Sequence, residues 1–226
     1  MRFPHHVNTA HINSTLSGGT NTGPPHGGSF AFRAQKAWYD ANMKQLTVNG
    51  TPFDVLRLLG KGKGGYSFLV RSQSMPYTEY VLKQIHHEPC PYYQFGDKIQ
   101  SEIRDYRRLR ELGVRLPTMF DVDISKERIL KEYVDGPTVY ELVLQDEMRP
   151  EYLEQVRFMA DQLARHHINI DYFPTNFVVQ DGLIHYIDFE CNDYMDEWNF
   201  ENWGIKYWSK TNEFLQYVAE HPSSAP

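Results

Sequence analysis

The sequence predicts an α+β fold in which strands and helices follow one another in blocks. β-Prone runs flank a cluster of glycines near residue 60 and recur at residues 80–85. Apolar residues recur at helical spacing over residues 97–109 and 150–167. A hairpin pattern lies between Asn176 and Asp188, so a second antiparallel pair of strands is expected late in the chain.

The first element is a glycine-rich hairpin. Val55–Leu59 and Phe68–Val70 are strand-like runs, and between them Gly60, Gly62 and Gly65 match the G-x-G-x-x-G spacing of nucleotide-binding loops. A dinucleotide-binding fingerprint would open a helix after the glycines, whereas β-prone residues follow here. A flexible hairpin without a ligand is the alternative, but glycines carry an entropic cost at a turn that does not use them.

A strand and a helix are expected after this hairpin. Lys83 lies in the strand-like run Tyr80–Ile85, and the amphipathic pattern of residues 97–109 predicts a helix. Glu102 borders the apolar stripe of that helix, so it can turn inward, and Asp105 is the less favoured alternative.

Residues 128–136 predict a further strand that runs out into a loop. Lys131 lies within this strand. If its side chain points inward it needs a carboxylate, because an unpaired buried charge is costly. The candidates are Glu102 and Glu190. Exposure of Lys131 to solvent, through a shift of register, is an equal alternative.

Polar residues at fixed spacing follow the second predicted helix. Asp171 and Asn176 are the first and last residues of a D-x-x-x-x-N motif, and Asp188 is the first residue of the sequence Asp188-Phe189-Glu190. Alone, each residue could cap a turn or end a strand. Their joint spacing favours phosphoryl transfer, in which one carboxylate faces the acceptor hydroxyl and oxygen ligands hold magnesium between the phosphates.

In this order, the glycine loop, Lys83, the helix glutamate, the strand at 128–136 and the motifs at 171 and 188 resemble the protein-kinase-like superfamily. The chain is similar to minimal bacterial serine/threonine-kinase-like proteins, of a size with the small kinase of the tRNA-threonylcarbamoylation complex. The resemblance implies a two-lobed protein-kinase-like fold, with an antiparallel N-lobe sheet plus one helix (residues 36–134) and a shortened helical C-lobe (residues 135–226). ATP and Mg²⁺ would lie in the cleft between the lobes.

The resemblance assigns catalytic and metal-binding roles. Asp171 would orient or deprotonate the acceptor, Lys83 would hold the α- and β-phosphates, and Glu102 would pair with Lys83. Asn176 and Asp188 would hold the metal.

The resemblance also assigns the nucleotide-binding residues. They are Gly60, Gly62, Gly64, Gly65, Tyr66, Leu69, Lys83, Glu132 and Val134. In the preferred register the glycine motif starts at Gly62, Tyr66 is the aromatic tip of the loop, and Leu69 covers the adenine. Backbone groups near Glu132 and Val134 would meet the edge of the base.

Two departures from the pattern bear on activity. Phe173 stands where serine/threonine kinases usually carry a lysine that contacts the γ-phosphate, and Lys61 or Lys63 could partly replace it. Glu190 replaces the glycine of D-F-G, which adds a carboxylate that could ligate a second metal. No A-P-E sequence follows, so a full activation segment and peptide-docking helices are not expected.

Three functions remain open from the sequence. The first is transfer of the γ-phosphate of ATP to a hydroxyl, with serine or threonine of a protein as the acceptor. The second is a small-molecule or sugar kinase, since no peptide platform is visible. The third is a nucleotide-binding pseudokinase that acts as a scaffold, which the loss of the loop lysine and the presence of Glu190 favour.

The C-terminal part carries an aromatic pattern. Its members, Phe200, Trp203, Tyr207, Phe214 and Val218, fit a helical stripe with a possible break near Thr211. The simplest interpretation is a helix that packs its aromatic residues onto the lobe holding the catalytic loop. A binding surface for a partner protein is the alternative.

Composition sets the remaining expectations. Residues 1–35 are rich in Gly, Pro and His and predict a flexible arm. No signal sequence or membrane span is recognised, so the cytoplasm is the expected location. Only Cys90 and Cys191 occur, which argues against a disulfide framework. A net charge of −6 argues against direct binding of nucleic acid.

Overall fold

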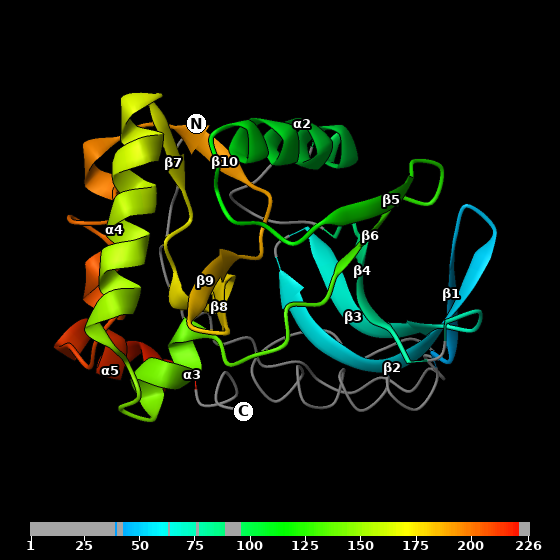
Figure 1. Cartoon of the computed structure of the whole chain (residues 1–226), viewed down its shortest axis with the longest axis horizontal. Helices are drawn as coiled ribbons and strands as arrows, with labels where there is room; N and C mark the ends of the chain where they lie inside the picture. Colours follow the sequence, from blue (N-terminus) through cyan, green and yellow to red (C-terminus); the bar gives the residue numbers. More distant parts are fainter. Residues whose placement is uncertain (1–38, 40–42, 63, 76, 89–95, 222–226) are drawn as a thin grey trace, which may run out of the picture.

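The structure is a computed structural model that describes residues 39, 43–62, 64–75, 77–88 and 96–221. The arm expected at residues 1–35, Lys63 and Cys90 lie outside the described residues. A sheet-rich first half is followed by a second half that holds most of the helices (Figure 1).

A six-stranded sheet makes up most of the first half. Its strands are β1 (Gln45–Val48), β2 (Thr51–Gly62), β3 (Gly65–Ser72), β4 (Glu79–Ile85), β5 (Met119–Asp123) and β6 (Arg128–Glu132). Every neighbouring pair is antiparallel, in the order β1-β2-β3-β4-β6-β5. The sheet is curled, and helix α2 (Lys98–Glu111) lies next to β5 (Figure 1). The helix expected at residues 97–109 is thus confirmed, with Asp97 as its N-cap.

Side chains alternate between the two faces along each strand, so one face of this sheet is apolar and the other carries Lys83. Tyr66, Phe68 and Leu82 share one face and belong to an apolar cluster with parts of β1 and β2. On the other face Lys83 is paired with Ser67 on β3 and with Ile129 on β6. This second face meets α2, and it is the face that carries the candidate site.

The second half is built around one large apolar cluster. Its helices are α3 (Val139–Leu144), α4 (Pro150–Arg165) and α5 (Asn212–Glu220), and its strands are β7 (Ile168–Ile170), β8 (Phe177–Gln180), β9 (Leu183–Tyr186) and β10 (Cys191–Asp193). Short 3-10 turns lie at η1 (Pro174–Asn176), η2 (Asp196–Trp198) and η3 (Gly204–Tyr207). The cluster packs α4 against the two small antiparallel pairs, β7–β10 and β8–β9. Among the described residues, no helix combines the length and apolar character needed to cross a membrane.

The aromatic helix expected near the C-terminus is only partly present, and the break expected near Thr211 is confirmed. η2 and η3 occupy its first part, and α5 begins anew after Thr211, whose hydroxyl accepts a hydrogen bond from the Phe214 N–H. Close packing explains the irregular stretch, since a Cβ added to Gly204 would lie 2.7 Å from the Cβ of Tyr172. The aromatic side chains do pack on the second half, with Trp208 and Phe214 fully buried.

Gly136, just after the strand β6, offers a sharp test of this packing. A Cβ added there would lie 2.0 Å from the Val179 carbonyl oxygen, which is backbone and cannot move aside cheaply. Gly136→Ala is expected to lower the free energy of unfolding by about 3 kcal/mol. Gly96→Ala is the matched control, because nothing lies within 4 Å of an added Cβ at that position. Equal urea midpoints for the two variants would show that the chain does not pack this closely at Gly136.

Candidate active site

A partly buried ion-pair cluster joins the sheet, α2 and the segment after β9. The ammonium of Lys83 lies 2.8 Å from Glu102 Oε1 and 3.2 Å from Asp188 Oδ1. The contact expected between Lys83 and Glu102 is therefore present. Asp105, the alternative partner, is paired with Arg104 instead.

The charges of this cluster stabilise one another. Burial by itself would lower the pKa of Lys83, but the carboxylates of Asp188 and Glu102 outweigh it and hold that pKa above its ordinary value. Burial would likewise raise the pKa of Asp188, but the neighbouring lysines, Lys83 first, lower it to about 2. Both groups are thus charged at neutral pH.

Lys98 is a member of this cluster that the sequence did not reveal. Its ammonium lies 3.9 Å from Glu102 Oε1, one helical turn away on α2, and its charge helps to lower the pKa of Asp188. The i,i+4 spacing was the available signal. A Cβ added to Gly64 would lie 2.0 Å from Lys98 Cε, so a glycine at this position lets the hairpin approach the lysine.

The glycine hairpin itself turns between Gly62 and Gly65, which are paired across β2 and β3. The tip therefore lies between these two glycines, and the register that starts at Gly62 with Tyr66 at the tip is corrected. Gly60, Gly62 and Gly65 instead flank the turn, as in the G-x-G-x-x-G spacing. Gly65 also lies close to the site, since an added Cβ would be 3.1 Å from Lys83 Cε.

Tyr66 and Lys61 lie on the opposite face of the sheet from Lys83. They are cross-strand partners, and both contact Glu88, Lys61 through an ion pair of 2.6 Å and Tyr66 through a short hydrogen bond from its hydroxyl. Lys61 therefore does not stand in for a lysine of the catalytic loop. Lys63, the other candidate, is outside the described residues.

The expected base-binding residues lie within β3, at the end of β6 and just after it. Leu69 is buried on the same face as Lys83. Val134 is 5% exposed, and no hydrogen bond of its backbone is recorded among the described residues. Buried backbone groups are normally paired, so this amide and carbonyl suit a polar ligand edge. One carboxylate oxygen of Glu132 already accepts a hydrogen bond from the Thr118 N–H.

The loop between β7 and β8 is tied down by hydrogen bonds. Asp171 Oδ1 accepts from the Phe173 N–H at 3.0 Å, and the Asn176 side-chain amide donates to the Asp171 carbonyl at 3.3 Å. The buried indole of Trp208 donates to the Tyr172 carbonyl at 2.8 Å. The C-terminal aromatic residues thus hold the loop that carries Asp171.

Three carboxylates converge near the phenol of Tyr186. The pairing of β10 with β7 brings Glu190 next to Asp171, and the Tyr186 hydroxyl donates to the Glu190 carbonyl at 2.9 Å. Burial first, and then the charges of Asp188, Asp171 and Glu190, raise the pKa of Tyr186 well above its ordinary value. Tyr186 is a second residue of the site that the motifs did not point to.

Asn176 and Asp188 are suited to holding a magnesium ion. The Ile187 N–H donates to the Asn176 carbonyl at 2.9 Å, which fixes the two candidate ligands on neighbouring segments. An amide oxygen and a carboxylate are hard donors, and magnesium is usually held by one or two protein groups together with substrate phosphates. Within the described residues no group of three or more His, Cys, Asp or Glu forms a metal site. The donor set fits magnesium that arrives with a nucleotide.

Phe173 is packed among aromatic rings. Its ring centroid lies 4.7 Å from that of Tyr217, 5.2 Å from Tyr207 and 6.4 Å from Trp203. The position where a lysine was expected in serine/threonine kinases thus serves packing between the catalytic loop and the C-terminal segment.

Lys131 is buried, as one of the two sequence interpretations required, but it is not paired with Glu102 or Glu190 through any described ion pair. Its ammonium donates to the Ile187 carbonyl at 2.5 Å. Burial first, and repulsion from Lys83 second, lower its pKa to about 8, while Asp188 and Glu102 oppose this shift.

This shift predicts a pH dependence of stability. Because Lys131 has a pKa of about 8 in the folded chain and an ordinary value of 10.5 when unfolded, the unfolded state binds more protons between these values. The free energy of unfolding should therefore rise relative to Lys131→Met as the pH increases from about 8 to about 10. Urea unfolding of both chains across this range measures the difference, and a difference that stays constant would contradict the prediction.

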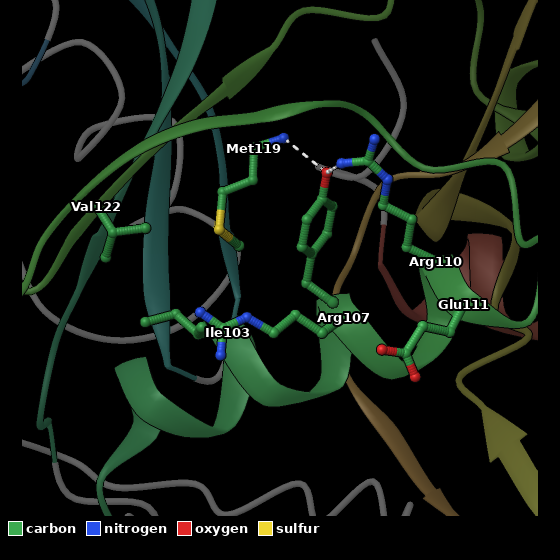
Figure 2. A pocket seen from close by; sticks show the side chains of 7 residues that line it. Ile103, Arg107, Arg110, Glu111, Met119 and Val122 are labelled. Carbon is green, nitrogen blue, oxygen red and sulfur yellow. Dashed lines mark hydrogen bonds between the residues drawn. The ribbon is translucent and has the colours of Figure 1, made fainter.

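A separate groove lies between α2 and β5. It has a volume of about 630 Å³ and is lined by Ile103, Tyr106, Arg107, Arg110, Glu111, Met119 and Val122. The Tyr106 hydroxyl accepts hydrogen bonds from the Met119 N–H, at 3.1 Å, and from the Arg110 guanidinium, at 3.2 Å. Figure 2 shows Met119 and Arg110 at this groove. Neither Lys83 nor Asp188 lines this groove, so it is distinct from the ion-pair cluster.

Comparison with known proteins gives a distant match. The chain is 30% identical over 99 residues to the KEOPS complex subunit Bud32 of Pyrococcus abyssi (strain GE5 / Orsay), which covers 42% of this chain and 44% of that protein. The match therefore spans less than half the length of the curated relative. No family model matches the chain. The similarity supports a relation to kinase-like proteins in general.

Proposed function

We propose that this chain is an ATP-dependent phosphotransferase that moves the γ-phosphate of ATP to a hydroxyl, with serine or threonine of a protein as the acceptor. The observation that carries the proposal is the buried contact of Lys83 with both Glu102 and Asp188. A lysine held between two carboxylates, beside a glycine hairpin, is suited to fixing the oxygens of a triphosphate.

In this proposal each side chain of the site has a separate task. Lys83 binds the α- and β-phosphates, and Glu102 keeps its ammonium in place. Asn176 and Asp188 hold magnesium, which when bound neutralises charge that develops on the phosphates. Asp171 orients the acceptor hydroxyl and accepts its proton.

The nucleotide would lie between the two halves of the chain, in a two-lobed kinase-like arrangement. The hairpin at Gly62 and Gly65 would cover its phosphates, and Leu69 would pack on the base. The backbone of Val134 would meet the polar edge of the adenine. This assignment is supported by the shared face of Leu69 and Lys83 and by the backbone groups of Val134 that have no recorded partner among the described residues.

The alternative is a nucleotide-binding scaffold without transferase activity. Phe173 favours it, because an aromatic cluster occupies the position where a lysine would contact the γ-phosphate. In that case ATP binds and no phosphate moves. A protein partner is part of either proposal, in line with the relative that is named as a subunit of a complex.

The destination of γ-labelled phosphate distinguishes these functions. The full chain is incubated with labelled Mg-ATP, alone and with a cell-free extract that contains proteins and small metabolites. Label on serine or threonine is the expected result. Label in the low-mass fraction would replace the protein acceptor by a small hydroxylated molecule, and bound ATP without any transfer would favour the scaffold.

A further inference from the structure

Lys131 contacts the residues on both sides of Asp188, one of the two expected metal ligands. It lies on β6, on the face of the sheet that carries Lys83, and only 6% of it is exposed. Its ammonium donates to the Ile187 carbonyl at 2.5 Å and lies 4.7 Å from the centre of the Phe189 ring. These two contacts are with the residues immediately before and after Asp188.

The segment held by Lys131 is also tied to Asn176. The Ile187 N–H donates to the Asn176 carbonyl at 2.9 Å, while the Ile187 carbonyl accepts from Lys131. Both backbone groups of Ile187 are therefore hydrogen-bonded, the N–H to Asn176 and the carbonyl to Lys131. The orientation of the next residue, Asp188, depends on this double attachment.

We propose that Lys131 is a positioning residue for the magnesium site. By holding the Ile187 carbonyl and the Phe189 ring, Lys131 fixes the carboxylate of Asp188, which would bind the metal. The inference rests on the proposed nucleotide site and adds a residue that acts on the metal through its ligand. Asp188 Oδ1 is otherwise held by the Phe189 N–H at 2.9 Å and by Lys83 at 3.2 Å. The Phe189 N–H belongs to the peptide that follows Asp188, whereas the Ile187 carbonyl held by Lys131 belongs to the peptide that precedes it. Lys131 therefore acts on Asp188 from the side that this bond leaves open.

The energetic cost of Lys131 supports a role beyond packing. A buried ammonium must be desolvated, and an apolar residue of similar volume would stabilise the fold equally well or better. The groups that face Lys131 are Lys83, which repels it, and the carboxylates of Asp188 and Glu102, which attract it. What an apolar side chain could not do is donate a hydrogen bond to the Ile187 carbonyl.

The binding of ATP with and without magnesium tests this role. Calorimetry measures the Kd for ATP in both conditions for the wild-type chain, Lys131→Met and the control Lys126→Met, which removes an exposed cation from the turn between β5 and β6. Magnesium should strengthen ATP binding by the wild type and the control. In Lys131→Met this gain should fall about 10-fold, which is the usual size of an effect transmitted through a metal ligand, with metal-free affinity unchanged.

Lys131→Gln provides a second variant, because it retains an N–H donor without the charge. Partial recovery of the magnesium gain is expected, and this readout would not respond to a loss of packing alone. A full gain in Lys131→Met, or equal losses with and without the metal, would overturn the inference.

Failure of the proposed function looks different. A wild-type chain that gains nothing from magnesium would overturn both the metal site and the role of Lys131. A wild-type chain that shows the gain but forms no ADP would overturn only the transferase, and the binding comparison would still decide the role of Lys131.

Discussion

Asp171→Asn is expected to lower the rate of phosphate transfer by about 10²- to 10⁴-fold, the usual contribution of a positioned general base. The amide retains an oxygen that can accept the hydrogen bond from the Phe173 N–H, so the loop should keep its geometry. ATP affinity should stay the same, because Asp171 is assigned to the acceptor and not to the nucleotide. Steady-state turnover and calorimetric Kd values measure the two quantities separately.

Asp193→Asn is the matched control for this experiment. Asp193 is an exposed carboxylate on β10, which pairs with the strand that leads to Asp171. Its replacement should leave turnover within about twofold of the wild type, since surface substitutions away from special features have small effects. If both aspartate variants retain full turnover, Asp171 is not the base.

Lys83→Met is expected to destabilise the fold as well as to abolish binding of ATP. The substitution leaves Glu102, which is 4% exposed, without its closest cation. Breaking a buried ion pair from one side typically costs about 3 to 5 kcal/mol, because the remaining charge has no compensation. Urea unfolding measures the change in the free energy of unfolding.

The double variant Lys83→Met/Glu102→Gln isolates the cause. Removal of the second charge should restore most of the lost stability, so that the two substitutions are strongly non-additive. ATP binding should not return, because the phosphate-binding ammonium is still absent. Additive losses would mean that Lys83 and Glu102 contribute to stability independently.

The local patterns of the sequence predicted most of the elements. The helices at α2 and α4 and the hairpin β8–β9 follow from periodicity and turn signals, which are carried by neighbouring residues. The Lys83–Glu102 contact was expected from the resemblance to kinases, since periodicity showed only that Glu102 could turn inward.

The parts that were missed depend on contacts between distant segments. The register of the glycine hairpin is decided by the pairing of Gly62 with Gly65, and the face on which Tyr66 lies follows from it. The partner of Lys131 is a backbone carbonyl 56 residues away, which no side-chain pattern can indicate. The helix near the C-terminus is shorter than its aromatic spacing predicts, because the residues around Gly204 pack closely and form a 3-10 turn in place of a regular helix.

The most direct test of the central claim is the formation of ADP from Mg-ATP by the wild-type chain and by Asp171→Asn, at equal concentrations. The account predicts ADP in the wild-type reaction that depends on magnesium and is nearly lost in the variant. Equal rates for the two chains, or no ADP from either beyond the amount that the cell extract forms by itself, would contradict a phosphotransferase at this site.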